Sequence, residues 1–337
     1  MSNQREAGWR LEDIGFYTLS DDRADHTSAD VPLARCELIV TGRCNFRCPY
    51  CRSVGGPDLS LEAAERTLDL WITDGLRNVR FSGGEPTLWP GLEHVVALCK
   101  DGGVERIALS TNGSASLSKY EGLLLAGAND FSISLDACCA EDVEQMTGGN
   151  RGAFDQIVES VRWLSARAYV TVGVVLTAEN ASRVGDTIQF AAGLGVSDIR
   201  VIPAAQAGTL LPPVKLPPSF DRSRFPILDY RLKNLAEGKG VRGNPTRRCG
   251  LVLDDMAVMG GEHYPCIIYM REGGAPIGQV GPQMRAERLE WACNHDCMRD
   301  PICAANCLDV CADYNNRVQN TNSTALVACG KEAMSDE

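Results

Sequence analysis

The sequence predicts an α/β fold, a partial (β/α)6 barrel followed by a small cysteine-rich domain. Two patterns support this prediction. From about residue 36 to residue 204, short runs of β-branched residues alternate with helical stretches, as in parallel βαβ units. From Cys249 onward, the chain holds eight of its 15 cysteines. A length of 337 residues suits one α/β barrel with an appended domain.

The barrel prediction depends on six strand candidates and the helical segments between them. Between the first two strands, Ser60 can cap a helix that places Leu68 and Trp71 on one apolar face. Gly75 can end that helix. The strand candidates span residues 37–41, 78–82, 106–110, 130–136, 169–177 and 198–203.

Composition divides the chain into four segments. The first residues are polar and lack the apolar stretch of a signal peptide. Five prolines between residues 211 and 226 are too many for a helix interior or a central strand. We therefore expect an N-terminal extension (1–35), the partial barrel (36–210), a proline-rich linker and helix (211–245) and the cysteine-rich domain (246–337).

The residues that could bind a cofactor or take part in catalysis follow the carboxyl ends of the predicted strands, as expected for βα architectures. The first strand is followed by a Cys-x3-Cys-x2-Cys loop formed by Cys44, Cys48 and Cys51. A cubane 4Fe–4S cluster needs four ligands, so three thiolates leave one iron open for a chelating substrate. The run from Gly83 to Pro86 follows the second strand, and Asn112 and Ser134 lie at the ends of the next two.

Two other kinds of site use similar cysteine spacing. A zinc knuckle has paired Cys-x2-Cys motifs with four protein ligands, and a thioredoxin-like site has one Cys-x-x-Cys beside a helix. Neither explains a Gly-Gly-Glu-Pro segment at the end of the next strand.

The cysteine triplet, Tyr50 just before its third cysteine and the Gly-Gly-Glu-Pro segment together resemble the radical S-adenosylmethionine (SAM) enzymes. The resemblance implies a radical SAM barrel in which Cys44, Cys48 and Cys51 hold a 4Fe–4S cluster whose open iron binds SAM. It also implies cofactor-binding roles at Tyr50, Gly83, Gly84, Glu85, Asn112 and Ser134. The glycines and Glu85 would hold the SAM amino group, and Asn112 and Ser134 would lie near its ribose or carboxylate.

The C-terminal cysteines resemble the SPASM/twitch domain of radical SAM enzymes, which carries auxiliary iron–sulfur clusters. The sequence departs from that pattern, because the usual Cys-x2-Cys pair is here Cys293-x3-Cys297, Cys311 is extra, and no cysteine closely follows Cys249. We expect at least one auxiliary 4Fe–4S cluster and favour a single one. The preferred ligands are Cys293, Cys297, Cys303 and Cys329, with Cys266, Cys307 and Cys311 as alternates; His263 and His295 are further candidates.

In the SPASM/twitch pattern Cys249 would be a ligand of the first of two auxiliary clusters. If that cluster is missing, Cys249 is free for catalysis. By its place in the family pattern, its thiol would face the substrate opposite SAM and return a hydrogen atom to a substrate radical. The chain most resembles radical SAM enzymes that tailor aminoglycosides, and the resemblance implies an epimerase acting on an aminoglycoside sugar. A radical SAM dehydrogenase of an amino sugar or aminocyclitol, a peptide-modifying radical SAM maturase and a non-enzymatic redox regulator remain as alternatives.

The net charge of −11 argues against nucleic acid as the main partner and suits a polycationic amino-sugar substrate. Asp254, Asp255, Glu262 and Asp296 are candidates to pair with its ammonium groups. The resemblance also implies an electron donor such as flavodoxin or ferredoxin. No apolar run approaches the length that spans a bilayer, so we expect no membrane association and a cytoplasmic location.

Overall fold

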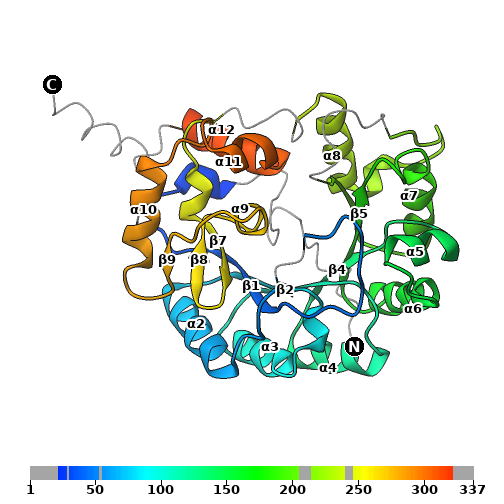
Figure 1. Cartoon of the computed structure of the whole chain (residues 1–337), viewed down its shortest axis with the longest axis horizontal. Coiled ribbons are helices and arrows are strands. Elements are labelled where there is room, and N and C mark those ends of the chain that lie inside the picture. The colour runs from blue at the N-terminus through cyan, green and yellow to red at the C-terminus, as the bar shows by residue number, and fades with distance from the viewer. Residues whose placement is uncertain (1–21, 29, 53–54, 205–213, 240–245, 322–337) are drawn as a thin grey trace.

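The computed structural model describes residues 22–28, 30–52, 55–204, 214–239 and 246–321. Most of the expected N-terminal extension, part of the proline-rich linker and Cys329 therefore lie outside the described residues. Six parallel strands form a curved sheet, and helices α2 to α7 lie on its outer side (Figure 1). The strands are β1 (Arg35–Thr41), β2 (Asn78–Gly83), β3 (Arg106–Thr111), β4 (Asp130–Ser134), β5 (Tyr169–Leu176) and β6 (Asp198–Pro203).

These strands confirm the partial (β/α)6 barrel, with bounds within two residues of those predicted. The helices around it are α2 (Leu61–Asp74), α3 (Leu92–Asp101), α4 (Leu117–Ala126), α5 (Ala140–Met146), α6 (Ala153–Ser165) and α7 (Val184–Gly193), and α8 (Pro226–Ala236) follows β6. The predicted caps of α2 are present. The Ser60 side chain accepts a hydrogen bond from the Ala63 amide, and Gly75 ends the helix with φ 98°.

The strands place alternate side chains on opposite faces of the sheet. Phe81, Leu109 and Phe131 are fully buried against the helices. Towards the carboxyl ends, the other face carries small side chains at Ser82, Ser110, Ser132, Ser134 and Gly173, and these line a cavity inside the barrel. Small residues at this level leave room for a ligand that larger side chains would fill.

The C-terminal segment extends the barrel sheet. Strand β7 (Asp255–Met259) pairs in parallel with β1, and β8 (Glu262–Tyr264) and β9 (Gly278–Gln279) continue in antiparallel order. Arg35 on β1 forms a buried ion pair with Asp254 just before β7. Around these strands lie α9 (Ile267–Arg271), α10 (Met284–Asn294), α11 (Pro301–Asn306) and α12 (Asp309–Asn320). The cysteine-rich segment is thus joined to the barrel by backbone pairing.

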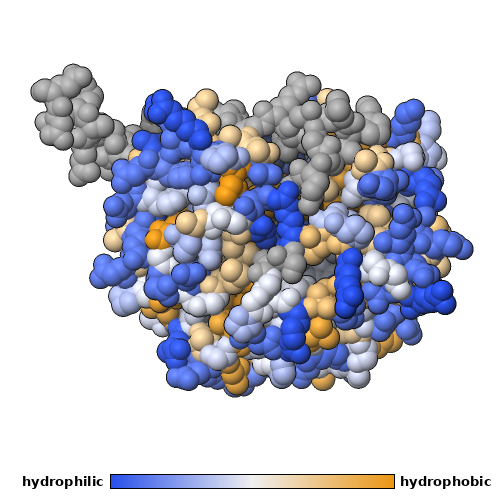
Figure 2. Space-filling model, in the orientation of Figure 1, coloured by the Kyte–Doolittle hydropathy of each residue, from blue (hydrophilic) through white to orange (hydrophobic). Residues whose placement is uncertain are grey.

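Hydrophilic side chains cover most of the outer helices on the face shown in Figure 2, in keeping with the high charge of the chain. Among the described residues, no helix combines the length and apolar character needed to cross a bilayer.

Candidate active site and thiol cluster

The three cysteines of the loop after β1 lie at the rim of a cavity of about 220 Å³ at the carboxyl ends of the strands. Cys44 and Cys51 are exposed and Cys48 is half-buried. The Cys51 amide donates to the Cys48 carbonyl at 3.0 Å, which folds the loop so that its thiols share this cavity. Burial raises the pKa of the Cys48 thiol to about 11, so metal binding must drive its deprotonation.

Gly83 and Gly84 lie beside these thiols and have no room for a side chain. A Cβ on Gly83 would lie 2.2 Å from the Thr41 carbonyl oxygen, and one on Gly84 would lie 2.2 Å from that of Arg43. Gly83 also has φ 148°, which a side chain would strain. The two glycines therefore let this turn pack directly against the backbone of the cysteine loop, and both line the cavity next to three thiols suited to iron. The donor set fits a 4Fe–4S cluster with one iron open to SAM.

The other predicted cofactor residues have distinct positions. Asn112, Ser134 and Tyr50 line the same cavity, and the Asn112 side-chain amide lies 3.9 Å from the Cys44 sulfur. Glu85 does not appear among the described residues that line it. Its buried carboxylate accepts hydrogen bonds from the Thr111 hydroxyl at 2.8 Å and the Asn112 amide at 2.7 Å. A direct contact between Glu85 and SAM stays a prediction, and the structure shows Glu85 holding the Asn112 loop.

We expect Glu85→Gln to weaken SAM binding roughly tenfold. The neutral amide of glutamine cannot replace a charge-assisted hydrogen bond of the Glu85 carboxylate, and the loss of one such bond costs about 1.5 kcal/mol or more. Cluster iron should stay unchanged, since Glu85 is not a thiol ligand. Equilibrium dialysis of the reconstituted protein with labelled SAM measures the affinity. Glu93→Gln, on the outer surface of α3, is the matched control. Parent-like affinity in the Glu85 variant would show that this segment is an ordinary turn.

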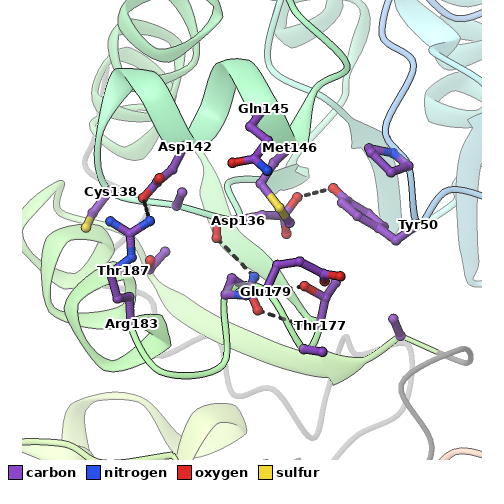
Figure 3. A pocket seen from close by; sticks show the side chains of 15 residues that line it. Tyr50, Asp136, Cys138, Asp142, Gln145, Met146, Thr177, Glu179, Arg183 and Thr187 are labelled. Atoms are coloured by element: carbon purple, nitrogen blue, oxygen red, sulfur yellow. Dashed lines mark hydrogen bonds and ion pairs between the residues drawn. The ribbon is translucent and has the colours of Figure 1, made fainter.

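A second cavity of about 390 Å³ adjoins the first and shares Tyr50 and Asp136 with it. Figure 3 shows the Tyr50 hydroxyl directed at the Asp136 carboxylate, to which it donates a hydrogen bond. The other Asp136 oxygen accepts from the Val175 amide at 2.6 Å. Burial raises the pKa of Asp136 to about 6 despite these donors. Sequence reasoning placed Asp136 at the end of a strand but gave it no role.

Further polar residues of the second cavity come from the segments that follow β4 and β5. Asp142 on α5 forms an ion pair with Arg183, and the Asn180 side chain accepts from the Thr177 amide at 2.8 Å. Figure 3 shows Glu179 beside them. No site role was predicted for these residues, although polar side chains that follow strands were the available signal.

Two arginines also line the first cavity. Arg200 on β6 donates to the Ser132 hydroxyl at 3.0 Å, and its Nε has no hydrogen-bond partner among the described residues. Arg271, at the end of α9, donates to the Gly83 carbonyl and the Ser82 hydroxyl, each at 3.2 Å. The cysteine-rich segment therefore contacts the barrel directly at the glycine turn.

A second group of thiols surrounds a small apolar cavity of about 30 Å³. We call its six members the C-terminal thiol cluster: Cys249, Cys266, Cys297, Cys303, Cys307 and Cys311. A contact with Cys297 together with burial raises the pKa of Cys249, and burial raises that of Cys266. Thiols gathered in this way are typical of metal ligands, because they need a cation to become thiolates.

The cluster brings together Cys297 and Cys303 of the preferred ligand set and all three alternates. Cys293 on α10 is disulfide-bonded, so its predicted role as a ligand requires the reduced thiol. Cys329 lies outside the described residues. Cys249 lies within the cluster and is not among the described residues that line either barrel cavity. Its sulfur accepts a hydrogen bond from the Asn315 side chain at 3.4 Å.

The acidic residues suggested for substrate binding are engaged elsewhere. Asp254 is buried in its ion pair with Arg35, and Asp296 pairs with Arg247 at 2.9 Å. Asp255 is only 2% exposed. Glu262 lies within 3.3 Å of the Gln279 side-chain amide, across the β8–β9 pair. Their spacing in the sequence gave no sign that protein partners already hold them.

Comparison with known proteins supports the barrel assignment. Residues 38–191 match the model of the radical SAM superfamily. A GTP 3′,8-cyclase of Pseudomonas fluorescens is 32% identical over 170 residues, which cover 46% of this chain and 49% of the relative. A probable GTP 3′,8-cyclase of Saccharolobus solfataricus is 29% identical over 177 residues, covering 51% and 57%. The chain thus spans about half the length of these curated relatives.

Solved structures share the fold over more of the chain. SuiB of Streptococcus suis has a TM-score of 0.58 at 15% identity, covering 77% of this chain and 66% of SuiB. The protein anSMEcpe, solved with bound AdoMet and the Cp18Cys peptide, has a TM-score of 0.54 at 15% identity, covering 89% and 99%. The family uses SAM and a 4Fe–4S cluster, and the loop after β1, with its three thiols, lies within the matched residues. Residues 38–191, a little under half of this chain, are thus similar to the radical SAM superfamily, and the solved structures share their fold.

Proposed function

We propose that this radical SAM enzyme is an epimerase that inverts a carbon stereocentre of an aminoglycoside sugar, of the type that converts neomycin C to neomycin B. The observation that carries the proposal is the number of thiols in the C-terminal thiol cluster. Six thiols surround one small cavity, whereas one cubane takes about four ligands. A single auxiliary cluster would therefore leave a thiol able to donate hydrogen.

The residues of the barrel have defined tasks in this reaction. Cys44, Cys48 and Cys51 would hold the radical SAM cluster, and the turn at Gly83 and Gly84 would let the backbone approach SAM. When bound, the cluster and SAM supply a 5′-deoxyadenosyl radical. Asn112 and Ser134, which line the same cavity, orient SAM by hydrogen bonds. Tyr50, held by its hydrogen bond to Asp136, lies at the boundary with the second cavity.

Cys249 is the proposed hydrogen donor. A sugar C–H bond breaks, and its hydrogen atom passes to the radical, which gives 5′-deoxyadenosine. The Cys249 S–H bond then breaks and a new C–H bond forms on the opposite face of the carbon. One electron, from a flavodoxin- or ferredoxin-type donor, and one proton return the thiyl radical to a thiol. Since Cys249 lies among other thiols, its alternative role is to bind iron. The variant Cys249→Ala separates hydrogen donation from iron binding.

The charged side chains that line the second cavity suit a cationic substrate. Asp136, Asp142 and Glu179 contribute carboxylates to its lining, against the single guanidinium of Arg183. Ammonium groups of an amino sugar can form charge-assisted hydrogen bonds with such carboxylates. The net charge of −11 would attract a polycation over longer range.

A single turnover in deuterated water tests the proposal. The reconstituted, reduced enzyme is mixed with SAM and neomycin C, and the product is analysed by mass spectrometry and NMR. We expect one deuterium at a non-exchangeable position of an inverted carbon, because the thiol proton exchanges with solvent. A reaction without SAM is the control. An oxidised sugar without deuterium would indicate a dehydrogenase and overturn the epimerase.

A second candidate function is the cyclisation of a purine nucleotide. The relatives named GTP 3′,8-cyclase suggest it, and one observation in the structure favours it. Arg200 and Arg271 present two guanidinium groups to the first cavity, and guanidinium groups suit phosphates. The same turnover with GTP in place of the aminoglycoside distinguishes the two. GTP consumption coupled to deoxyadenosine formation, with no change to the sugar, would support the nucleotide reaction.

A further inference from the structure

His295 lies immediately after α10, at the edge of the C-terminal thiol cluster. Its ring stacks on Trp291, with centroids 4.0 Å apart and planes inclined by 14°. Tyr269 meets the ring edge-on at 5.8 Å. Both aromatic residues also line the cavity formed by the six thiols. Two fixed contacts therefore set the direction in which the imidazole nitrogens point.

The imidazole points its Nε2 towards two thiols of the cluster. Nε2 lies 3.8 Å from the Cys303 sulfur. One ring nitrogen of His295 and the sulfurs of Cys297 and Cys303 all lie within 4.8 Å of one another. Imidazole nitrogen and thiolate sulfur are both ligands of iron. No other group of three or more such ligand atoms converges in this way within the described residues.

Asp300, the N-cap residue of α11, supports this arrangement. One carboxylate oxygen accepts hydrogen bonds from the Ile302 and Cys303 amides at 2.9 and 2.8 Å, which caps the helix and fixes the position of Cys303. The other lies 3.5 Å from Nε2 of His295 and accepts from the Tyr269 hydroxyl at 3.2 Å. Asp300 thus fixes the position of Cys303 and holds Tyr269, which packs against the imidazole.

We propose that His295 is a ligand of an auxiliary iron–sulfur centre, together with Cys297 and Cys303. Its nitrogen takes the position for which the sequence spacing had suggested Cys293, whose sulfur is engaged in a disulfide. The inference concerns the metal centre and does not depend on which substrate the radical SAM domain attacks. A neutral imidazole adds no negative charge to the cluster, so the centre should have a higher reduction potential than one with thiolates alone.

The experiment uses full-length protein with Cys44, Cys48 and Cys51 replaced by alanine, so that only the C-terminal centre contributes. After reconstitution with iron and sulfide and reduction, pulsed EPR measures nitrogen couplings to the cluster. We expect a strong ¹⁴N coupling that changes to ¹⁵N when only the histidines carry the label. That label identifies histidine without altering the chain.

Variants separate ligation from packing. His295→Phe keeps an aromatic ring against Trp291 but cannot bind iron, and it should lose the coupling. His295→Cys should keep the iron, lose the coupling and lower the reduction potential. His94→Phe, on the exposed surface of α3, is the matched control and should keep both the coupling and the potential.

Three results would overturn the proposal. The first is a reconstituted centre without histidine coupling. The second is a coupling that persists in His295→Phe, which would assign it to another histidine. The third is the absence of iron from the C-terminal segment. SAM cleavage by the protein with an intact Cys44–Cys51 loop is measured separately, so failure of this inference leaves the test of the proposed function unaffected.

Discussion

We expect Cys48→Ala to abolish both SAM cleavage and product formation, and Cys44→Ala and Cys51→Ala to do the same. In the proposed site each thiol supplies one of three protein ligands in a single loop, and two thiolates cannot hold a cubane with one open iron. Production of 5′-deoxyadenosine, measured by liquid chromatography and mass spectrometry after reduction, should fall below detection. Iron bound at this loop should be lost as well.

A thiol elsewhere in the barrel provides the control. Cys139 is half-buried at the start of α5, outside the loop and both barrel cavities. Cys139→Ser should retain SAM cleavage, since serine is a good residue at a helix N-terminus. Deoxyadenosine production by any one of the three loop variants would be incompatible with the radical SAM chemistry assigned to these cysteines.

Cys249→Ala is expected to separate radical formation from product formation. If Cys249 donates hydrogen and does not bind iron, the variant keeps its iron, binds SAM and still forms deoxyadenosine. Epimer should fall to a trace, and starting material or side products should appear instead. Cys249→Ser should behave in the same way, because an alcohol O–H bond is too strong to donate its hydrogen to a carbon radical.

Iron analysis decides between the two roles of Cys249. With one auxiliary cluster the reconstituted parent should hold about eight irons per chain, and with two it should hold about twelve, since each cubane contains about four. Loss of iron in Cys249→Ala would show that Cys249 is an iron ligand and not the hydrogen donor. Normal epimer yield with intact clusters would exclude it as donor and direct the search to Cys266 or Cys307 of the same thiol cluster.

Much of the barrel was predictable because its determinants are local. The alternation of β-branched runs with helical segments placed all six strands, and Ser60 and Gly75 marked both ends of α2. Three cysteines within eight residues lie close together in any fold, so their spacing alone was enough to predict a metal site in the loop after β1. The carboxyl ends of parallel strands meet at one edge, which explains why Asn112 and Ser134 joined the same cavity.

Contacts between distant residues could not be predicted in the same way. Nothing in the residues of β7 indicated that it would pair with β1, an arrangement accompanied by the buried ion pair of Arg35 with Asp254. Tyr50 and Asp136 are 86 positions apart, and their hydrogen bond depends on the curvature of the sheet. Two carboxylates suggested for the substrate, those of Asp254 and Asp296, turned out to be paired with arginines.

The sequence by itself determined the barrel, the three-cysteine loop and the cysteine-rich nature of the C-terminal segment, because periodicity and short spacing fix local backbone geometry. Only the tertiary structure decided which sulfurs of that segment meet and that His295 lies beside Cys303. The physical reason is that the ends of α9, α10, α11 and α12 bring these side chains together. Helix α9 packs against β7 and β8, α11 packs on α9, and α10 and α12 pack against residues 250–253, and residue spacing does not encode these contacts.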